Sequence, residues 1–260
     1  MTVTSSNPDR DAILTLIREW KWFAYVPPEA HEWLADHSRI HSFSKGDHVY
    51  RSGDPVSHIY GVISGVFRIY FTAMSGDEVT GEELVRGSWF PHTLVSNKPE
   101  YYGSCVCQQD ALVVQIPQAA MTEFAERWPG YFKGLYCEMT DRGPATISRI
   151  MLLTLHTLNV RLAVYLLRMA RIRGVQEKNG AVFIPGEVSQ TELGARVGGT
   201  RQRINALLMA WAKNGVIELS KEGTRIIDIK RLTVEAKKSG FELEQYLAGW
   251  HAGWQGKKQE

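Results

Sequence analysis

Apolar and polar residues alternate in short runs between about residues 40 and 116. We expect strands at residues 48–51, 59–63, 66–71, 78–85, 104–107 and 112–116. Turns that contain glycine separate these runs, at residues 45–47, 52–54, 64–65 and 75–77. Glycine accepts the backbone angles of tight turns, and short runs between such turns are typical of antiparallel sheets. The pattern therefore predicts an antiparallel β domain.

The apolar period becomes helical from Gln118 onward. One apolar stripe consists of Ile147, Ile150, Met151, Thr154, Leu155 and Leu158. Since residues three and four apart share a helix face, these side chains lie on one side of a long helix. That side packs either on its own domain or on a second copy of the chain. Pro144 follows Gly143 in the same helix and lacks an amide donor, which predicts a kink or a restart there.

Residues 189–214 predict two helices joined by a sharp turn. Ser189 and Glu192 have the spacing of a capping box, in which each side chain satisfies a free amide of the first helical turn. Gly198 and the glycine after it allow the turn, and Thr200 offers a hydroxyl cap for the second helix. Gly215 then ends that helix. The segment is predicted to be a helix-turn-helix, with a helical hairpin in a core as the alternative.

The second of these helices has one apolar face and one slim polar face. Its expected buried residues are Ile204, Leu207, Leu208 and Trp211, and its outward residues are Gln202, Asn205, Ala206, Met209 and Lys213. Amide and guanidinium groups on the first turns of such a helix can reach base edges in the major groove. Arg201 suits guanine, whereas Gln202 and Asn205 suit adenine, and the small Ala206 permits close approach.

Residues 216–229 form two β-rich runs around Lys221-Glu222-Gly223, which predicts a hairpin. A hairpin directly after the second helix makes a winged helix. Residues 188–231 hold eight Lys or Arg against four Asp or Glu, although the whole chain of 260 residues has a net charge of only +2. Such a local basic excess favours DNA binding. We assign DNA contacts to Ser189, Gln190, Thr200, Arg201, Gln202, Arg203, Asn205, Ala206, Lys213, Lys221 and Arg225.

The composition narrows the class of protein further. A chain of 260 residues is long enough for two domains with cores of their own. Three cysteines, an odd number without a paired framework, fit a reducing compartment. The first residues lack an apolar signal core, and no run approaches the ~20 apolar residues of a membrane span. We expect a cytoplasmic protein that does not enter a membrane.

Three segments in this order resemble the CRP/FNR family of bacterial transcription regulators, the family of the cyclic-AMP receptor protein. They are FSKGDHVYRSGDPVSHIYGVISGVFRIY from residue 43, RLAVYLLRMA from residue 161 and SQTELGARVGGTRQRI from residue 189. The resemblance covers roughly residues 43–232 and implies an α+β fold. That fold has an N-terminal cyclic-nucleotide-binding-like β-roll, a long dimerisation helix and a C-terminal winged helix-turn-helix.

The resemblance also implies a domain order and a set of partners. We expect an N-terminal helical segment at 1–38, a β-roll sensor at 39–117, helices including the dimerisation helix at 118–160, a DNA-binding domain at 161–232 and a C-terminal helical extension at 233–260. The expected partners are double-stranded DNA on a near-palindromic site, a second copy of the chain in a homodimer, an unknown small-molecule effector and, as an alternative, RNA polymerase. Arg201 matches the family's base-reading Arg. Gln202 stands where many members have Glu, and Ala206 stands where the cyclic-AMP receptor protein has a second Arg.

The roll departs from the cyclic-nucleotide pattern at two places. Pro91-His92-Thr93 follows Phe90 where such members carry a Gly-Glu pair, and residues 101–104 replace their Arg-Ser or Arg-Thr pair. A buried phosphate without its Arg loses roughly 3 to 5 kcal/mol, or about two to three orders of magnitude in affinity. We therefore expect an effector other than cyclic AMP. Thr146 aligns with an adenine-contacting Thr, a match too weak to reverse this expectation.

The vacated pocket would be lined by aromatic and small polar side chains. The candidate effector-binding residues are Trp89, Phe90, His92, Tyr101, Tyr102, Ser104 and Thr146. They suit an aromatic or hydrophobic ligand with a few polar anchors. The alternative is that the aromatic side chains fill the space, so that the regulator is effector-independent.

No cofactor and no metal site are expected. An iron-sulfur cluster is not expected, since no Cys precedes Cys105. Cys105 and Cys107 lie two apart on one strand face, where burial is the default and a redox-sensing dithiol the alternative. Haem through His92 also stays open, although a lone His among aromatic residues is more often a packed side chain.

Other classes of function fit the sequence less well. A cupin-like enzyme could use a β-roll, but no His/Glu ligand spacing or nucleophile arrangement occurs, and we expect no catalytic residues. A module that only binds nucleotides would need the missing Glu and Arg. Beyond the wing, residues 241–254 predict a helix with Leu243, Tyr246, Leu247, Trp250 and Trp254 on one face. This face packs either on its own chain or on a partner such as RNA polymerase.

Overall fold

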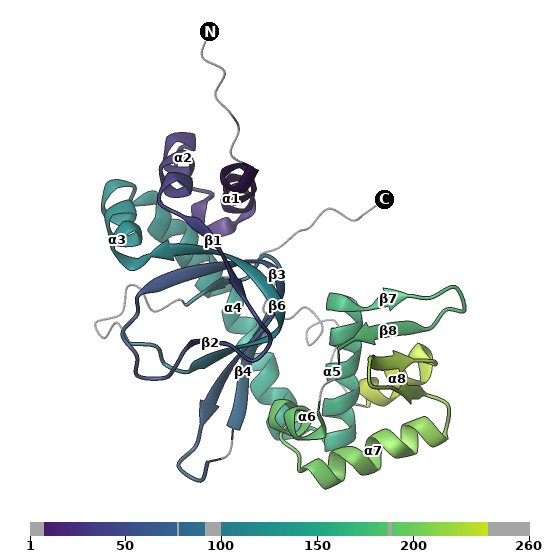
Figure 1. Ribbon diagram of the computed structural model, residues 1–260. Helices are drawn as coiled ribbons and strands as arrows, with labels where there is room; N and C mark the ends of the chain where they lie inside the picture. The colour runs from purple at the N-terminus through teal and green to yellow at the C-terminus, as the bar shows by residue number, and fades with distance from the viewer. Residues whose placement is uncertain (1–7, 77, 92–99, 187–188, 239–260) are drawn as a thin grey trace. The chain divides into compact units, whose positions relative to one another are not determined.

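The computed structural model describes residues 8–76, 78–91, 100–186 and 189–238 (Figure 1). The chain divides between Asp141 and Arg142 into two compact units, each with cores of its own. The first unit contains the N-terminal helices and a sheet, and the second contains the helix-turn-helix and a small sheet. The predicted mixed α and β class is thereby confirmed. The predicted helix at residues 241–254 lies outside the described residues.

Helices build one core of the first unit. They are α1 (Pro8–Glu19), the short 3-10 helix η1 (Lys21–Phe23), α2 (Pro28–Asp36) and α3 (Gln118–Arg127). Their apolar faces join Trp20, Trp22, Phe23 and the sheet residue Trp89 in a single buried cluster. The rings of Phe23 and Trp89 meet edge to face, with centroids 5.3 Å apart.

The antiparallel sheet of the first unit confirms the predicted β domain. It contains β1 (Arg39–Phe43), β2 (His48–Tyr50), β3 (His58–Thr72), β4 (Glu78–Leu84), β5 (Trp89–Phe90) and β6 (Ser104–Pro117). The order is β1-β6-β3-β4, while β2 pairs with β6 and β5 pairs with β3. The long strands β3 and β6 pair along most of their length, from His58 opposite Pro117 to Tyr70 opposite Ser104. They form the backbone of the sheet.

Two strand boundaries predicted from the sequence are wrong. The runs expected at residues 59–63 and 66–71 are one strand, β3, and those at 104–107 and 112–116 are one strand, β6. Residues 64–65 form no turn between strands; the register of β3 against β6 shifts there instead. Gly65 has a φ of +89°, and a β-carbon at this position would lie 2.7 Å from the carbonyl oxygen of Asp110. Glycine therefore permits a bulge within a continuous strand.

Two long helices follow α3 along the chain: α4 (Gly130–Leu155) and α5 (Leu158–Arg173). The helix α4 crosses the division between the units and continues through Pro144, so the expected restart is not observed. Proline still removes one amide donor from the helix at this point. The predicted apolar stripe is shorter than expected, because Leu158 begins α5 and is buried in the core of the second unit.

In its described residues, the second unit contains the end of α4, four further helices and a small sheet. The helices are α5, α6 (Gln190–Val197), α7 (Arg201–Lys213) and α8 (Ile229–Lys237), and the strands are β7 (Val175–Gln176), β8 (Val182–Pro185), β9 (Ile217–Leu219) and β10 (Gly223–Ile226). The sheet order is β7-β8-β10-β9, with β9 and β10 forming the predicted wing. The apolar pattern of the sequence did not predict β7 and β8. The sequence signal for this hairpin was Asn179-Gly180, a dipeptide typical of hairpin turns. Gly180 has the positive φ of +84° that such turns need.

We predict that Gly65→Ala destabilises the first unit by about 3 kcal/mol, since both the left-handed backbone and the close approach of β6 resist a side chain. Urea unfolding measures this loss. Gly46→Ala is the matched control, because Gly46 has a φ of +97° but open space around it. We expect the control to lose only about 1 to 2 kcal/mol. Equal losses in the two variants would show that contact with β6 is unimportant.

Candidate nucleic-acid interface

The first helix of the helix-turn-helix begins at a complete capping box. The Ser189 hydroxyl accepts a hydrogen bond from the Glu192 amide at 3.1 Å, and the Glu192 carboxylate accepts one from the Ser189 amide at 3.1 Å. The helix ends at Val197, and Gly198 follows in the left-handed conformation with a φ of +66°. These observations confirm the predicted bounds of α6. These two reciprocal hydrogen bonds therefore fix the first turn of α6.

The turn between the helices is tight because small residues meet in it. A β-carbon on Gly194 would collide with the carbonyl oxygen of Gly199, and a β-carbon on Gly199 would lie 2.6 Å from a methyl group of Leu158. The Thr200 hydroxyl then caps α7 by accepting from the Arg203 amide at 3.4 Å. The close approach sets where the first turn of α7 lies relative to α6.

The two faces of α7 agree with the sequence pattern. Ile204 and Leu208 are buried, and Leu207 and Trp211 are half-buried against the same core. The outward residues Gln202, Asn205, Ala206, Met209 and Lys213 are all exposed. Arg201 and Arg203 at the helix start are exposed too. The helix therefore offers a polar surface with two guanidinium groups at its capped N-terminus.

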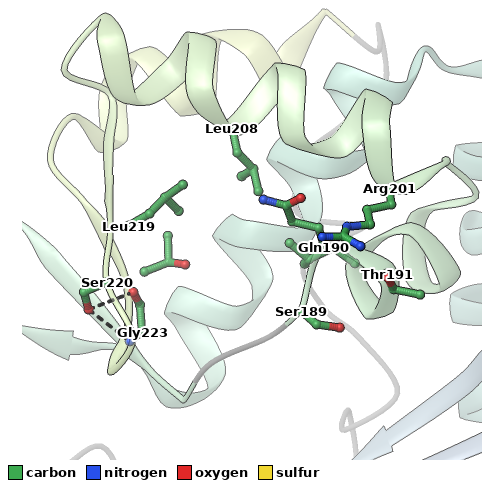
Figure 2. Close-up of a pocket in the computed structure, with 10 residues that line it drawn as sticks. Ser189, Gln190, Thr191, Arg201, Leu208, Leu219, Ser220 and Gly223 are labelled. Atoms are coloured by element: carbon green, nitrogen blue, oxygen red, sulfur yellow. Dashed lines mark hydrogen bonds between the residues drawn. The ribbon is translucent and has the colours of Figure 1, made fainter.

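The structure brings three of the expected DNA contacts to one cavity. Ser189, Gln190 and Arg201 line a cavity of about 460 Å³ (Figure 2). Its other lining residues are Thr191, Leu193, Leu208, Leu219, Ser220, Gly223 and Thr224. The cavity thus lies between the helix-turn-helix and the wing, and its wall carries hydroxyl, amide and guanidinium groups. Thr191, Ser220 and Thr224 were not among the residues predicted from the sequence. The signal for them was the concentration of hydroxyl side chains in the wing and at the start of α6.

The wing turn is closed by its own polar groups. The Ser220 amide donates to the carbonyl oxygen of Gly223 at 2.9 Å, and the Ser220 hydroxyl accepts from the amides of Glu222 and Gly223 at 3.2 Å. Lys221 at the turn is exposed.

Arg225 lies further along β10 and is half-buried. Its guanidinium donates to Glu177 at 3.0 Å and to Glu218 at 2.9 Å, so it has partners within the small sheet. A DNA contact by Arg225 stays a prediction.

Another guanidinium, that of Arg161, lies at the turn before α7, where a β-carbon on Gly198 would be 2.9 Å from its Nη1. The Arg161 side chain, on α5, donates to the carbonyl oxygen of Leu153 at 3.4 Å and is half-buried. Burial lowers the pKa of Arg161, and the nearby positive charge of Arg203 lowers this pKa further. The two cations therefore raise the local potential around the turn, which favours an anionic partner.

The candidate effector residues of the roll face different ways. Trp89 packs among the N-terminal helices, whereas Phe90 and Tyr101 belong to the core inside the sheet. The Tyr101 ring stacks on Tyr50, with centroids 3.7 Å apart and planes 4° apart. Tyr102 is 84% exposed. Only Phe90 and Tyr101 among these four candidates lie in one cluster.

The remaining candidates for the roll are dispersed or undescribed. The Ser104 hydroxyl accepts from the Ser52 amide at 3.1 Å at the strand end. Thr146 lies on α4 in the second unit, where its hydroxyl donates to the carbonyl oxygen of Arg142 at 3.1 Å. His92 falls outside the described residues. The role of each in binding an effector stays a prediction.

The two strand cysteines are buried, as sequence analysis expected by default. Cys105 and Cys107 are free thiols in the sheet core. Burial raises the pKa of Cys107 to about 11, and burial also raises the pKa of Cys105. Protonated thiols are weak nucleophiles, which disfavours the redox alternative.

The described part of the chain contains no group of three His, Cys, Asp or Glu placed to hold a metal ion. Among its helices, none is long and apolar enough to cross a bilayer.

Comparison with known proteins places both units in families. A model of the cyclic nucleotide-binding domain matches residues 40–127, and a model of the Crp-like helix-turn-helix domain matches residues 160–234. A CRP-like cAMP-activated global transcriptional regulator of Mycobacterium tuberculosis is 25% identical over 215 residues, which are 83% of this chain and 96% of the relative.

Solved structures share the fold. A CRP-family transcriptional regulator from Thermus thermophilus superimposes with a TM-score of 0.64 at 21% identity, over 79% of this chain and 99% of that one. The c-di-GMP responsive global regulator CLP of Xanthomonas campestris gives a TM-score of 0.66 at 16% identity, over 77% and 99%. At these identities the likeness to solved structures shows the fold alone.

Proposed function

The chain belongs to the CRP/FNR family of DNA-binding transcription regulators, and we propose that it acts as a homodimer on a near-palindromic DNA site. The family is one of regulators rather than enzymes. The observation that carries the proposal is the exposed polar face of α7, which begins at a capped N-terminus beside the wing. This arrangement suits a recognition helix whose first turns enter the major groove.

Direct base reading is assigned to the first two turns of α7. Arg201 can donate two hydrogen bonds to guanine, and Gln202 lies next to it on the outward side. Ala206 adds no bulk that would hold the helix away from the bases. The exposed cations Lys213 and Lys221 suit phosphate oxygens, which position the protein without reading sequence. Together they support a site that combines sequence reading with phosphate contacts.

The homodimer is assigned to the apolar stripe of α4. Ile147, Ile150 and Leu155 are 59%, 55% and 64% exposed in the single chain. Exposed apolar side chains in such a row mark an interaction surface. A second copy of the same helix is the partner we propose, since a two-fold symmetric pair covers the same surface on both chains. Two recognition helices would then reach successive major grooves about 34 Å apart.

A small molecule other than cyclic AMP is the signal we propose for the roll. The curated relative is described as cAMP-activated and one structural neighbour as c-di-GMP responsive, so members of this fold respond to different signals. In the roll of this chain, the buried Arg68 is already paired with Glu78 at 2.6 Å. Phe90 and Tyr101 are instead aromatic groups suited to a hydrophobic ligand.

One observation favours an effector-independent regulator as the second candidate. Tyr50, Phe90 and Tyr101 are all buried in one cluster, with Tyr50 stacked flat on Tyr101. Side chains packed in this way fill volume that a ligand would occupy. Burial also raises the pKa of Tyr50 well above its usual value, so this phenol stays neutral within the core.

Arg201→Ala is expected to weaken binding to the selected DNA site by about 1 to 3 kcal/mol and to relax one base position, because it removes a direct base contact. Fluorescence anisotropy with cognate and scrambled duplexes measures both effects. Lys213→Ala is the matched comparison. It should weaken binding equally on all DNA sequences and lower the slope of log affinity against log salt concentration by about one. Equal losses on both duplexes for Arg201→Ala would remove it from base reading.

Ile147→Glu is expected to dissociate the homodimer, since it buries two unpaired carboxylates at a symmetric interface. A cost of about 3 kcal/mol or more corresponds to a dissociation constant raised at least about 100-fold. Sedimentation velocity over a concentration series measures this change. Arg149→Glu places a carboxylate about 200° around the helix from Ile147, on the side opposite the stripe, and should leave the dimer intact. An unchanged dimer in Ile147→Glu would exclude this face of α4.

Cyclic AMP at millimolar concentration is expected to leave the melting temperature unchanged, whereas a true effector would raise it by several degrees. A thermal-shift screen with cyclic nucleotides and aromatic metabolites tests both candidates for the roll. Stabilisation by cyclic AMP would contradict the proposed signal. A screen without any stabilising compound, together with specific DNA binding by the protein alone, would favour the effector-independent alternative.

A further inference from the structure

A hydrogen bond joins the two helices of the helix-turn-helix at their outer surface. Gln190 is the first residue of α6, and its Nε2 donates to Oδ1 of Asn205 at 2.8 Å. Asn205 lies one turn after Arg201 on α7 and is exposed. Gln190 is half-buried and stands with Arg201 on the wall of the cavity in Figure 2. A residue of the first helix therefore holds a base-facing side chain of the second.

Both residues of this hydrogen bond lie on backbone that other contacts fix in place. The capping box of Ser189 and Glu192 holds the first turn of α6, where Gln190 begins the helix. Asn205 follows the buried Ile204, which anchors α7 in the core. The side-chain pair thus connects two helix segments that are fixed by other contacts, and the Asn205 amide cannot turn by itself without breaking the hydrogen bond.

The orientation of the Asn205 amide decides which bases it can read. An asparagine that recognises adenine uses both ends, because Oδ1 accepts from N6 and Nδ2 donates to N7. Free in solution, the amide rotates readily and can present either end. In this structure Gln190 holds Oδ1 toward α6, which leaves the Nδ2 donor to face outward. Sequence alone suggested adenine, whereas an outward donor suits bases that present acceptors.

We propose that Gln190 is a positioning residue that sets the base preference of Asn205. By holding Oδ1, it makes Asn205 a donor that selects guanine, with adjacent O6 and N7 acceptors, or thymine, with its O4 acceptor. Cytosine presents only a donor there, and adenine places its N6 donor beside N7. The inference rests on the proposed function, in which the outward face of α7 lies in the major groove.

Gln190→Glu reverses the polarity of this contact without removing it. A carboxylate at residue 190 can only accept, so Asn205 turns its Nδ2 toward α6 and presents Oδ1 to the groove. We expect the preferred base to change from guanine or thymine to cytosine or adenine, which carry donors. The substitution suits the fold, because a negative charge in the first turn of a helix is favourable.

Thr191→Glu is the matched control for the added charge. It places the same carboxylate one residue further along α6, at an exposed position on the same cavity wall. Repulsion from DNA phosphates should weaken both variants to a similar degree at low salt. Only Gln190→Glu should change the base preference, and adding Asn205→Ala to it should remove that change.

The experiment is selection from a randomised duplex library with the full chain, followed by affinity measurements on duplexes that differ at the one position that Asn205→Ala relaxes. In the wild type we expect guanine or thymine there, with a preference of about tenfold. Gln190→Glu should lose or reverse this preference, and Gln190→Leu, which has no donor and no charge, should relax it. Circular dichroism checks that each variant is folded.

Two results would overturn the inference while leaving the proposed function intact. One is a wild-type motif that Gln190→Glu and Gln190→Leu both leave unchanged at this position. The other is an equal change of base preference in Thr191→Glu, which would assign the effect to charge alone. A wild type that selects no sequence from the library would instead overturn the proposed function, and the inference with it.

Discussion

The close approach of α6 and α7 determines the geometry of the whole DNA-binding unit. Gly194 and Gly199 meet without β-carbons between them, and Leu158 of α5 packs against the same turn. Because the turn has little free volume, the start of α7 has one position relative to α6. The Arg201 side chain and the Gln190–Asn205 contact both depend on that position. A larger residue in the turn would therefore move the proposed base-reading surface as a whole.

A different constraint acts in the β-roll, because aromatic side chains occupy the core that its sheet encloses. Adjacent residues of a strand point to opposite faces, so Trp89 and Phe90 serve two separate cores. Trp89 ties the sheet to the N-terminal helices, and Phe90 packs among the tyrosines inside the roll. A signal that enters this interior must displace or reorient aromatic rings. Such repacking is the physical link we expect between a ligand and the sheet.

Local sequence signals predicted much of the fold because their causes are local. The Ser189 capping box, the Thr200 cap and the turn at Gly198 each involve groups within a few residues, and the structure confirms them. The boundary expected at residues 64–65 failed for the opposite reason. Gly65 is required by contact with β6, a strand far away in the sequence, and no local pattern distinguishes such a bulge from a turn. The continuation of α4 through Pro144 was also not predicted.

The sequence by itself determined the family, the two faces of α7 and the residue types that can read DNA. These follow from spacing and side-chain chemistry, which need no knowledge of distant neighbours. Only the tertiary structure decided how those residues are used. It joined Gln190 to Asn205 across the turn and gave Arg225 two carboxylate partners in the small sheet. Hydrogen bonds and ion pairs between distant residues depend on packing, so the donor or acceptor left for DNA is set by the fold.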